Sequence, residues 1–171
     1  NPIMKSKRQE IWAKIPPDVQ ICAVTKGRSL EEVEDLLQDL PQIKVIAENR
    51  WPDCEEKFQN FPSTKKHFIG HLQKNKLNKI LPLVDAIQSI DSLELLQLIS
   101  EKTLKPIEFT FQVNISKDPA KQGIKPENLR EIIEKSQKLP NVKLIGLMTI
   151  GAQENQEKYF TEFKTLFDEI N

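Results

Sequence analysis

Ile21-Cys22-Ala23-Val24-Thr25-Lys26 is an uncharged run that ends in a lysine, within a chain of 171 residues. Small and β-branched residues in such a run are typical of a strand that is covered on both faces. Short runs rich in Ile and Val recur along the chain and alternate with longer amphipathic stretches, as in a mostly parallel α/β sheet. We predict strands at 19–25, 44–47, 66–70, 84–89, 107–115 and 142–149.

Helices are predicted between the strands from capping residues and from apolar periodicity. Ser29 followed by Glu32 has the spacing of a capping box, and Ser92 can cap a later helix. Pro126 stands at a favourable first position of another helix. The predicted helices are 2–14, 30–40, 93–102, 127–138 and 154–170.

The composition predicts one soluble, neutral domain over residues 1–171. Basic and acidic side chains number 25 each, and hydrophobic residues make up 38% of the chain. This balance argues against an extended nucleic-acid surface. The lysines within 65–79 fit a solvated helix face, because aromatic residues do not alternate with them. No apolar run is long enough for a membrane span, so we expect neither a membrane nor a nucleic-acid partner.

The cysteines and glycines exclude several common sites. Cys22 and Cys54 lack the spacing of a zinc ribbon or a disulfide framework, which fits a reducing cytoplasm. No apolar stretch follows the basic N-terminal residues, so we expect no signal peptide. The five glycines form neither a Gly-x-Gly-x-x-Gly motif nor a Gly-Lys-Ser/Thr loop.

The number of strand–helix units leaves two architectures open. A closed (β/α)8 barrel has eight units and typically about 250 residues, whereas this chain has six predicted units. The chain forms either an open, doubly wound sheet or most of a barrel whose last two units are absent.

Polar residues follow nearly every predicted strand. In parallel α/β folds the residues that do chemistry lie at the carboxyl ends of strands, where the loops open on one face. We therefore expect these residues to line one pocket. The residues at these strand ends are Lys26, Glu48-Asn49-Arg50, His71 with Gln73, Ser89 with Asp91, Asn114 with Ser116, and Met148-Thr149.

Lys26 is the most informative candidate, because an apolar strand leads to it. A lysine inside a barrel mouth would be partly desolvated, and desolvation favours the neutral, nucleophilic amine. Such a lysine can form a Schiff base. The alternative is a lysine that extends from the strand end into solvent.

His67 and His71 lie four residues apart but do not predict a metal site. Phe-Ile-Gly between them favours a strand, in which four residues span roughly 13 Å. No carboxylate or cysteine cluster replaces them as ligands. We expect His71 to line the pocket and His67 to be structural; alternatively, both only satisfy local hydrogen bonds.

Several motifs resemble, in order and spacing, the pyridoxal phosphate homeostasis proteins (YggS or PROSC type). The resemblance extends over nearly the whole chain, from about residue 19 to residue 170. The matching motifs are AVTK (23–26), ENR (48–50), HFIGHLQ (67–73) with NK (75–76), SIDS (89–92), QVN (112–114) and GLMTI (146–150).

The resemblance implies a fold-type III pyridoxal phosphate (PLP) barrel, like the N-terminal domain of alanine racemase. It implies that Lys26 forms a Schiff base with PLP, and that the protein holds and delivers PLP without an established catalytic turnover. Positions that match the family's pocket-lining motifs are Asn49, His71, Ser89, Asn114 and Met148.

The chain departs from the family in two places. Ala47 stands where the family usually has glycine. Family members also continue, past the helix that ends here at Asn171, into two further strands that grip the PLP phosphate. We therefore expect weak PLP binding by this chain, whose only arginines are Arg8, Arg28, Arg50 and Arg130.

Two other functions stay open. The first is a fold-type III enzyme, such as a racemase or a decarboxylase. Two-base racemisation in that class uses a tyrosine and a second domain, and the single tyrosine, Tyr159, lies in the last predicted helix. The second is an interaction module, because an incomplete barrel exposes two sheet edges. We expect a monomer for a complete barrel and a dimer or domain-swapped form for this chain.

Overall fold

The computed structural model describes residues 6–171, which contain one sheet of six parallel strands. Each strand overlaps one of the six predicted strands, β5 and β6 begin at the predicted residues, and the other ends differ by one to three residues. The strands are β1 (Cys22–Val24), β2 (Val45–Glu48), β3 (Lys65–Phe68), β4 (Ala86–Ile90), β5 (Ile107–Gln112) and β6 (Val142–Met148).

Seven α-helices and two short 3-10 helices surround the sheet. The helices are α1 (Lys7–Trp12), α2 (Leu30–Asp39), α3 (Asp53–Asn60), α4 (Leu77–Ile80), α5 (Leu93–Lys102), α6 (Pro126–Ser136) and α7 (Gln156–Ile170), with η1 (Lys74–Lys76) and η2 (Leu81–Leu83) on either side of α4. Five of them were predicted, and residues 2–5 of the predicted first helix lie outside the described residues. Helices α3 and α4 were missed, and neither has a side-chain hydrogen bond from its N-cap residue, Pro52 or Lys76.

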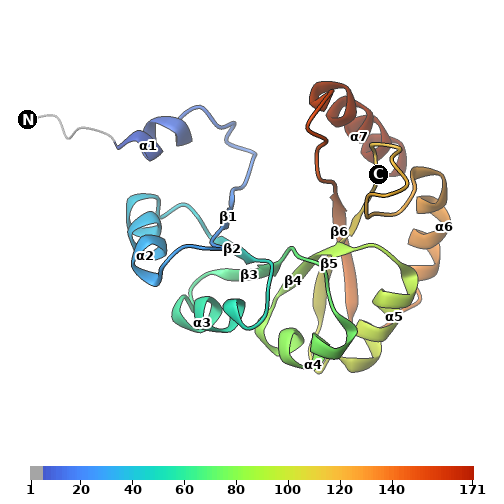
Figure 1. Ribbon diagram of the computed structural model, residues 1–171, viewed down its shortest axis with the longest axis horizontal. Coiled ribbons are helices and arrows are strands. Elements are labelled where there is room, and N and C mark those ends of the chain that lie inside the picture. The colour runs from blue at the N-terminus through green and yellow to red at the C-terminus, as the bar shows by residue number, and fades with distance from the viewer. Residues whose placement is uncertain (1–5) are drawn as a thin grey trace, which may run out of the picture.

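Strand order decides between the two predicted architectures. In doubly wound sheets the chain reverses direction, so the first strand lies inside the sheet. Here every strand pairs in parallel with the strand before it, in the order β1-β2-β3-β4-β5-β6. Figure 1 shows a curved sheet with helices α2 to α6 along its outer side in chain order. The fold is therefore a partial (β/α)8 barrel.

The hydrophobic core lies between the outer face of the sheet and the helices. Phe68, Ile87 and Phe109 are in this core with residues of α3, α5 and α6. Their strand neighbours face the inside of the arc, because successive residues of a strand point to opposite faces. There His67 Nδ1 lies 2.9 Å from the side-chain amide of Gln88. The inner face is thus partly polar.

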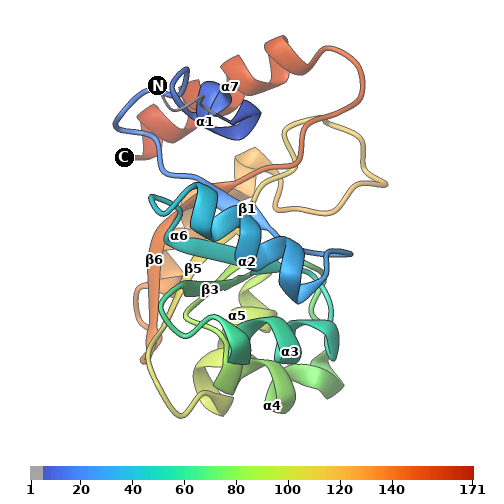
Figure 2. The same cartoon turned by 90° about the vertical axis from the view of Figure 1, so that its left-hand side faces the viewer.

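Strands β1 and β6 form the two edges of the sheet within residues 6–171. Figure 1 shows α1 and α7 near the two ends of the arc, and Figure 2 shows α2 over the strands on the β1 side. Val24 on β1 is 48% exposed, and Ile145 on β6 is 44% exposed. In this part of the chain, no helix is both long and apolar enough to cross a bilayer.

Candidate functional site

Lys26 lies in a tight turn that begins where β1 ends. The Arg28 N–H donates to the Thr25 carbonyl at 3.1 Å and closes the turn. Gly27 has a φ of 71°, a left-handed conformation that glycine adopts without strain. Thr25 is anchored on β2, because its amide (3.0 Å) and its hydroxyl (3.3 Å) both donate to the Ala47 carbonyl. The sequence TKGR therefore places Lys26 at the corner of an anchored turn.

The Lys26 side chain is exposed. The expectation of a partly desolvated lysine is therefore wrong for this structure. Among the described residues, β1 pairs with β2 alone, so no strand covers the other side of the turn. The amine is accessible to a small molecule from solution.

The ends of β2, β3 and β4 approach one another closely at the same rim. A Cβ on Gly70 would lie 2.1 Å from the Asn49 carbonyl oxygen, so only glycine fits there. The buried Ser89 hydroxyl donates to the Gly70 carbonyl from the other side. Gly70 thus brings Asn49 and Ser89 close to each other.

Asn49 and His71 line one hollow of about 480 Å³. Trp51 forms an aromatic wall, and the Lys76 ammonium lies 5.0 Å from the centre of its ring. Arg50 adds a second positive charge, and no carboxylate is among the described lining residues. The hollow is therefore suited to an anionic group.

Asn114 and Met148 lie elsewhere along the rim. The Asn114 amide donates to the carbonyls of Asp118 (2.7 Å) and Lys121 (3.3 Å), and its oxygen accepts from the Ser116 hydroxyl at 2.8 Å. Asn114 thus shapes the loop after β5, and it lines a separate hollow of about 230 Å³. Met148 is the half-buried last residue of β6.

The structure does not bring the six predicted residues into one pocket. Asn49 and His71 share a hollow, whereas the others are spread along the rim. The sheet is an open arc, so β1 carries Lys26 and β6 carries Met148 to opposite edges.

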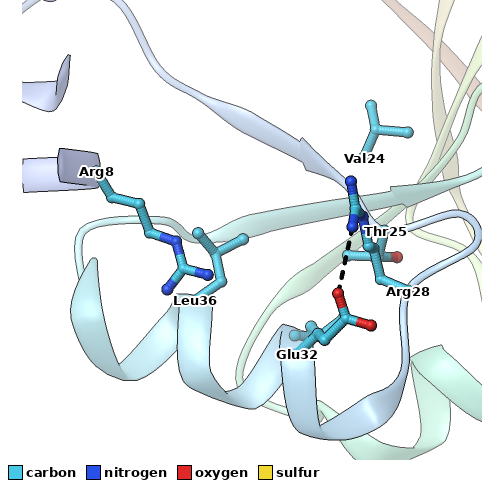
Figure 3. Close-up of a pocket in the computed structure, with 7 residues that line it drawn as sticks. Arg8, Val24, Thr25, Arg28, Glu32 and Leu36 are labelled. Atoms are coloured by element: carbon cyan, nitrogen blue, oxygen red, sulfur yellow. Dashed lines mark hydrogen bonds and ion pairs between the residues drawn. The ribbon is translucent and has the colours of Figure 1, made fainter.

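A smaller hollow of about 290 Å³ lies between α1, β1 and α2, beside the turn of Lys26. Figure 3 shows Arg28 reaching toward Glu32, with Arg8 on the far side of the hollow. Arg28 pairs with Glu32 at 3.3 Å, and Arg8 pairs with Asp35 at 2.9 Å. Because both guanidinium groups have carboxylate partners, this hollow is not a free anion site.

Within residues 6–171, no three His, Cys, Asp or Glu side chains are grouped to hold a metal ion. His67 lies in β3, which ends at Phe68, and His71 lies beyond the strand end. Burial lowers the pKa of His67, and the Lys65 charge lowers it further. His67 is therefore a neutral residue of the inner face.

The chain matches the family model described as alanine racemase, N-terminal domain, over residues 4–171. It is 33% identical over 160 residues to the pyridoxal phosphate homeostasis protein of Aquifex aeolicus, covering 87% of this chain and 70% of that protein. For the protein of the same name from Synechocystis, the identity is 31% over 172 residues, covering 95% of this chain and 78% of that protein. The chain belongs to the pyridoxal phosphate homeostasis protein family.

Solved structures support the barrel fold for this member of the pyridoxal phosphate homeostasis proteins. PipY of Synechococcus elongatus, solved with PLP bound, has a TM-score of 0.83 at 24% identity, covering 95% of this chain and 79% of PipY. An alanine racemase of Clostridium difficile has a TM-score of 0.78 at 21% identity, covering 95% of this chain and 46% of the racemase.

Sequence reasoning did not single out Lys57 on α3, which lies behind the turn of Lys26. Lys57 is buried, and its ammonium contacts the Thr25 carbonyl and the carboxylate of the buried Glu48. Burial raises the pKa of Glu48, and Lys57 partly opposes that rise. A sequence signal existed: Lys57 lies between Cys54 and Phe58, which mark the apolar face of the helix at four-residue spacing.

Proposed function

We propose that residues 1–171 form one PLP-binding barrel domain, which holds PLP covalently on Lys26 as part of PLP homeostasis. The observation that carries the proposal is the turn at 25–28, which presents an accessible lysine at the rim where barrel proteins bind ligands. Membership of the pyridoxal phosphate homeostasis family supports the choice of ligand.

The residues present fit the aldehyde end of PLP, which supplies an electrophilic carbon when bound. Lys26 would hold PLP covalently through its ε-amine, with the loss of one water molecule. The hydrogen bonds of Thr25 to Ala47 hold the peptide that precedes the lysine. The chain therefore supplies an amine on a well-ordered stretch of backbone.

The anionic end of PLP has a weaker fit. A phosphate dianion is best held by several backbone N–H groups or by a bidentate arginine. Arg8 and Arg28 are paired with carboxylates. Arg50 and Lys76 line the hollow beside Asn49 and His71, and these four are the phosphate-end contacts that we propose. We expect weak non-covalent affinity.

We further propose that the protein carries PLP without catalytic turnover and works in the cytoplasm. The names of its relatives support carriage, and two free cysteines support a reducing compartment. Ser89, Asn114 and Met148 would then shape the rim. We propose a monomer for a complete barrel and association through the sheet edges for this chain.

The test is borohydride reduction of the protein mixed with PLP, followed by peptide mass spectrometry. We expect a stable pyridoxyl adduct on Lys26 and an imine absorbance that Lys26→Ala abolishes. Lys158→Ala is the matched control, because Lys158 is an exposed lysine on α7. If Lys26 is labelled no faster than Lys158, the proposal is wrong.

A further inference from the structure

A buried ion pair lies directly behind the turn that carries Lys26. Glu48, the last residue of β2, is 1% exposed, and Lys57 is 6% exposed. The Lys57 ammonium lies 3.5 Å from Glu48 Oε1 and 2.9 Å from the Thr25 carbonyl oxygen. Thr25 directly precedes Lys26, so a buried charge contacts the peptide that leads into the proposed PLP lysine.

The hydrogen bond from Lys57 to Thr25 has better geometry than the ion pair between Lys57 and Glu48. The ammonium lies closer to the Thr25 carbonyl than to the carboxylate, and Glu48 Oε2 has no hydrogen-bond partner among the described residues. Apolar residues can often replace a buried ion pair without loss of stability. A buried ion pair is therefore weak evidence for a role in stability, and the contact with Thr25 points to a role in positioning the turn.

We propose that Lys57 is a positioning residue that fixes the Thr25 carbonyl and, with it, the turn that presents Lys26. This inference rests on the proposed function of Lys26 and extends it to the buried ammonium group behind the turn.

The Thr25 carbonyl accepts two hydrogen bonds, from the Arg28 N–H at 3.1 Å and from Lys57. The charged donor makes the stronger bond, and burial excludes competing water. Without Lys57 the Thr25 carbonyl keeps only the hydrogen bond from the Arg28 N–H, although the Thr25 amide and hydroxyl stay bonded to Ala47, and Gly27 adds freedom on the other side. Because reaction with an aldehyde needs a well-placed amine, a looser turn slows the reaction at Lys26.

The experiment compares four versions of the 171-residue protein: the wild type, the double variant E48Q/K57M, the single variant E48Q and the control K66M. The single variant K57M would leave the buried charge of Glu48 without a partner. The double variant avoids this because it removes both charges. E48Q removes the carboxylate charge, but the glutamine side chain keeps an oxygen that can accept a hydrogen bond from Lys57, and Lys57 stays as the donor to Thr25. K66M is the control because it also removes a lysine amine that donates to a backbone carbonyl. The Lys66 amine lies 3.1 Å from the Pro62 carbonyl oxygen, near the start of β3 and away from the turn.

Two quantities are measured. The first, without PLP, is the hydrogen-exchange rate of the Arg28 amide, which reports on the turn. The second is the rate of PLP labelling at Lys26 divided by the rate at Lys158. We expect exchange about ten-fold faster and relative labelling about ten-fold slower in E48Q/K57M, from loss of one charged hydrogen bond. E48Q and K66M should stay within about two-fold of the wild type, and β4 amides should be unchanged throughout.

A folded double variant with wild-type exchange and labelling would overturn the inference. So would a double variant that does not fold, because the pair would then serve stability and not position. If the wild type is not labelled at Lys26, the proposed function fails, but Arg28 exchange still shows whether Lys57 fixes the turn.

Discussion

The two cysteines differ in how far the fold shields their thiols. Cys54 is buried on α3, and burial raises the pKa of its thiol to about 12, with the Glu48 charge adding to the rise. Cys22 is half-buried at the start of β1, and burial also raises the pKa of this thiol. Since the thiolate is the reactive form, both thiols are slow nucleophiles in the folded protein.

We predict that Cys54 stays unmodified by an aromatic disulfide reagent at pH 8. A pKa of about 12 leaves ~10⁻⁴ of the thiol as thiolate at that pH, and burial blocks access as well. The measurement is the rate of colour release from C22S and C54S, each of which retains one thiol. We expect C54S to react faster, and both variants to react fully in denaturant. Fast release from folded C22S would contradict the shielding of Cys54.

At the scale of elements, β3 and β4 join polar side chains across the inner face of the arc. The Gln88 amide lies 2.9 Å from His67 Nδ1, and an amide N–H can donate there only while Nδ1 is unprotonated. Burial also lowers the pKa of His67. These two strands therefore hold His67 in its neutral form and disfavour its protonation.

His67 makes the stability of the protein depend on pH. Its pKa is lower in the folded than in the unfolded state, so below about pH 6.5 the unfolded state binds more protons. The free energy of unfolding should therefore fall as the pH drops through that range. Urea titrations at pH 7.5 and pH 5.5 should show a larger loss for the wild type than for H67Q, which cannot titrate. An equal loss of the free energy of unfolding in H67Q would rule out this role for His67.

At the scale of the whole molecule, the arc has a well-protected centre and two open edges. Strand β4 pairs with β3 and β5, and Ala86, Ile87 and Ile90 are fully buried. Strand β1 has three residues and, within residues 6–171, one neighbouring strand. Local stability should therefore decrease from β4 towards β1.

Hydrogen exchange should show this gradient. We expect the amides of β4 to exchange only through global unfolding and those of β1 to exchange at least ~100-fold faster. Amides in the buried part of α5, around Leu96, serve as an internal reference. If β1 pairs with another copy of the chain, its protection will rise with protein concentration, and light scattering will detect the larger species. Equal protection of β1 and β4 at low concentration would contradict the open arc.

Features that depend on neighbouring residues were predictable. Helix α5 begins and ends at the predicted residues, and Ser92 caps it through the Leu95 amide at 3.1 Å. The capping box of Ser29 and Glu32 is present at the start of α2. These features need only a few consecutive residues, so the sequence contains the full interaction. Helix α3 lacks such a capping side chain and was missed.

Local sequence was also enough to find the six strands and to single out Lys26 as a candidate Schiff-base lysine, and the resemblance to a known family added PLP as its ligand. The tertiary structure alone decided that the strands pair in chain order, that Lys26 is exposed, and that Lys57 lies 2.9 Å behind the Thr25 carbonyl. Strand pairing and burial depend on residues that are far apart in the chain. Thr25 and Lys57 are 32 positions apart and meet only because β1, β2 and α3 pack together.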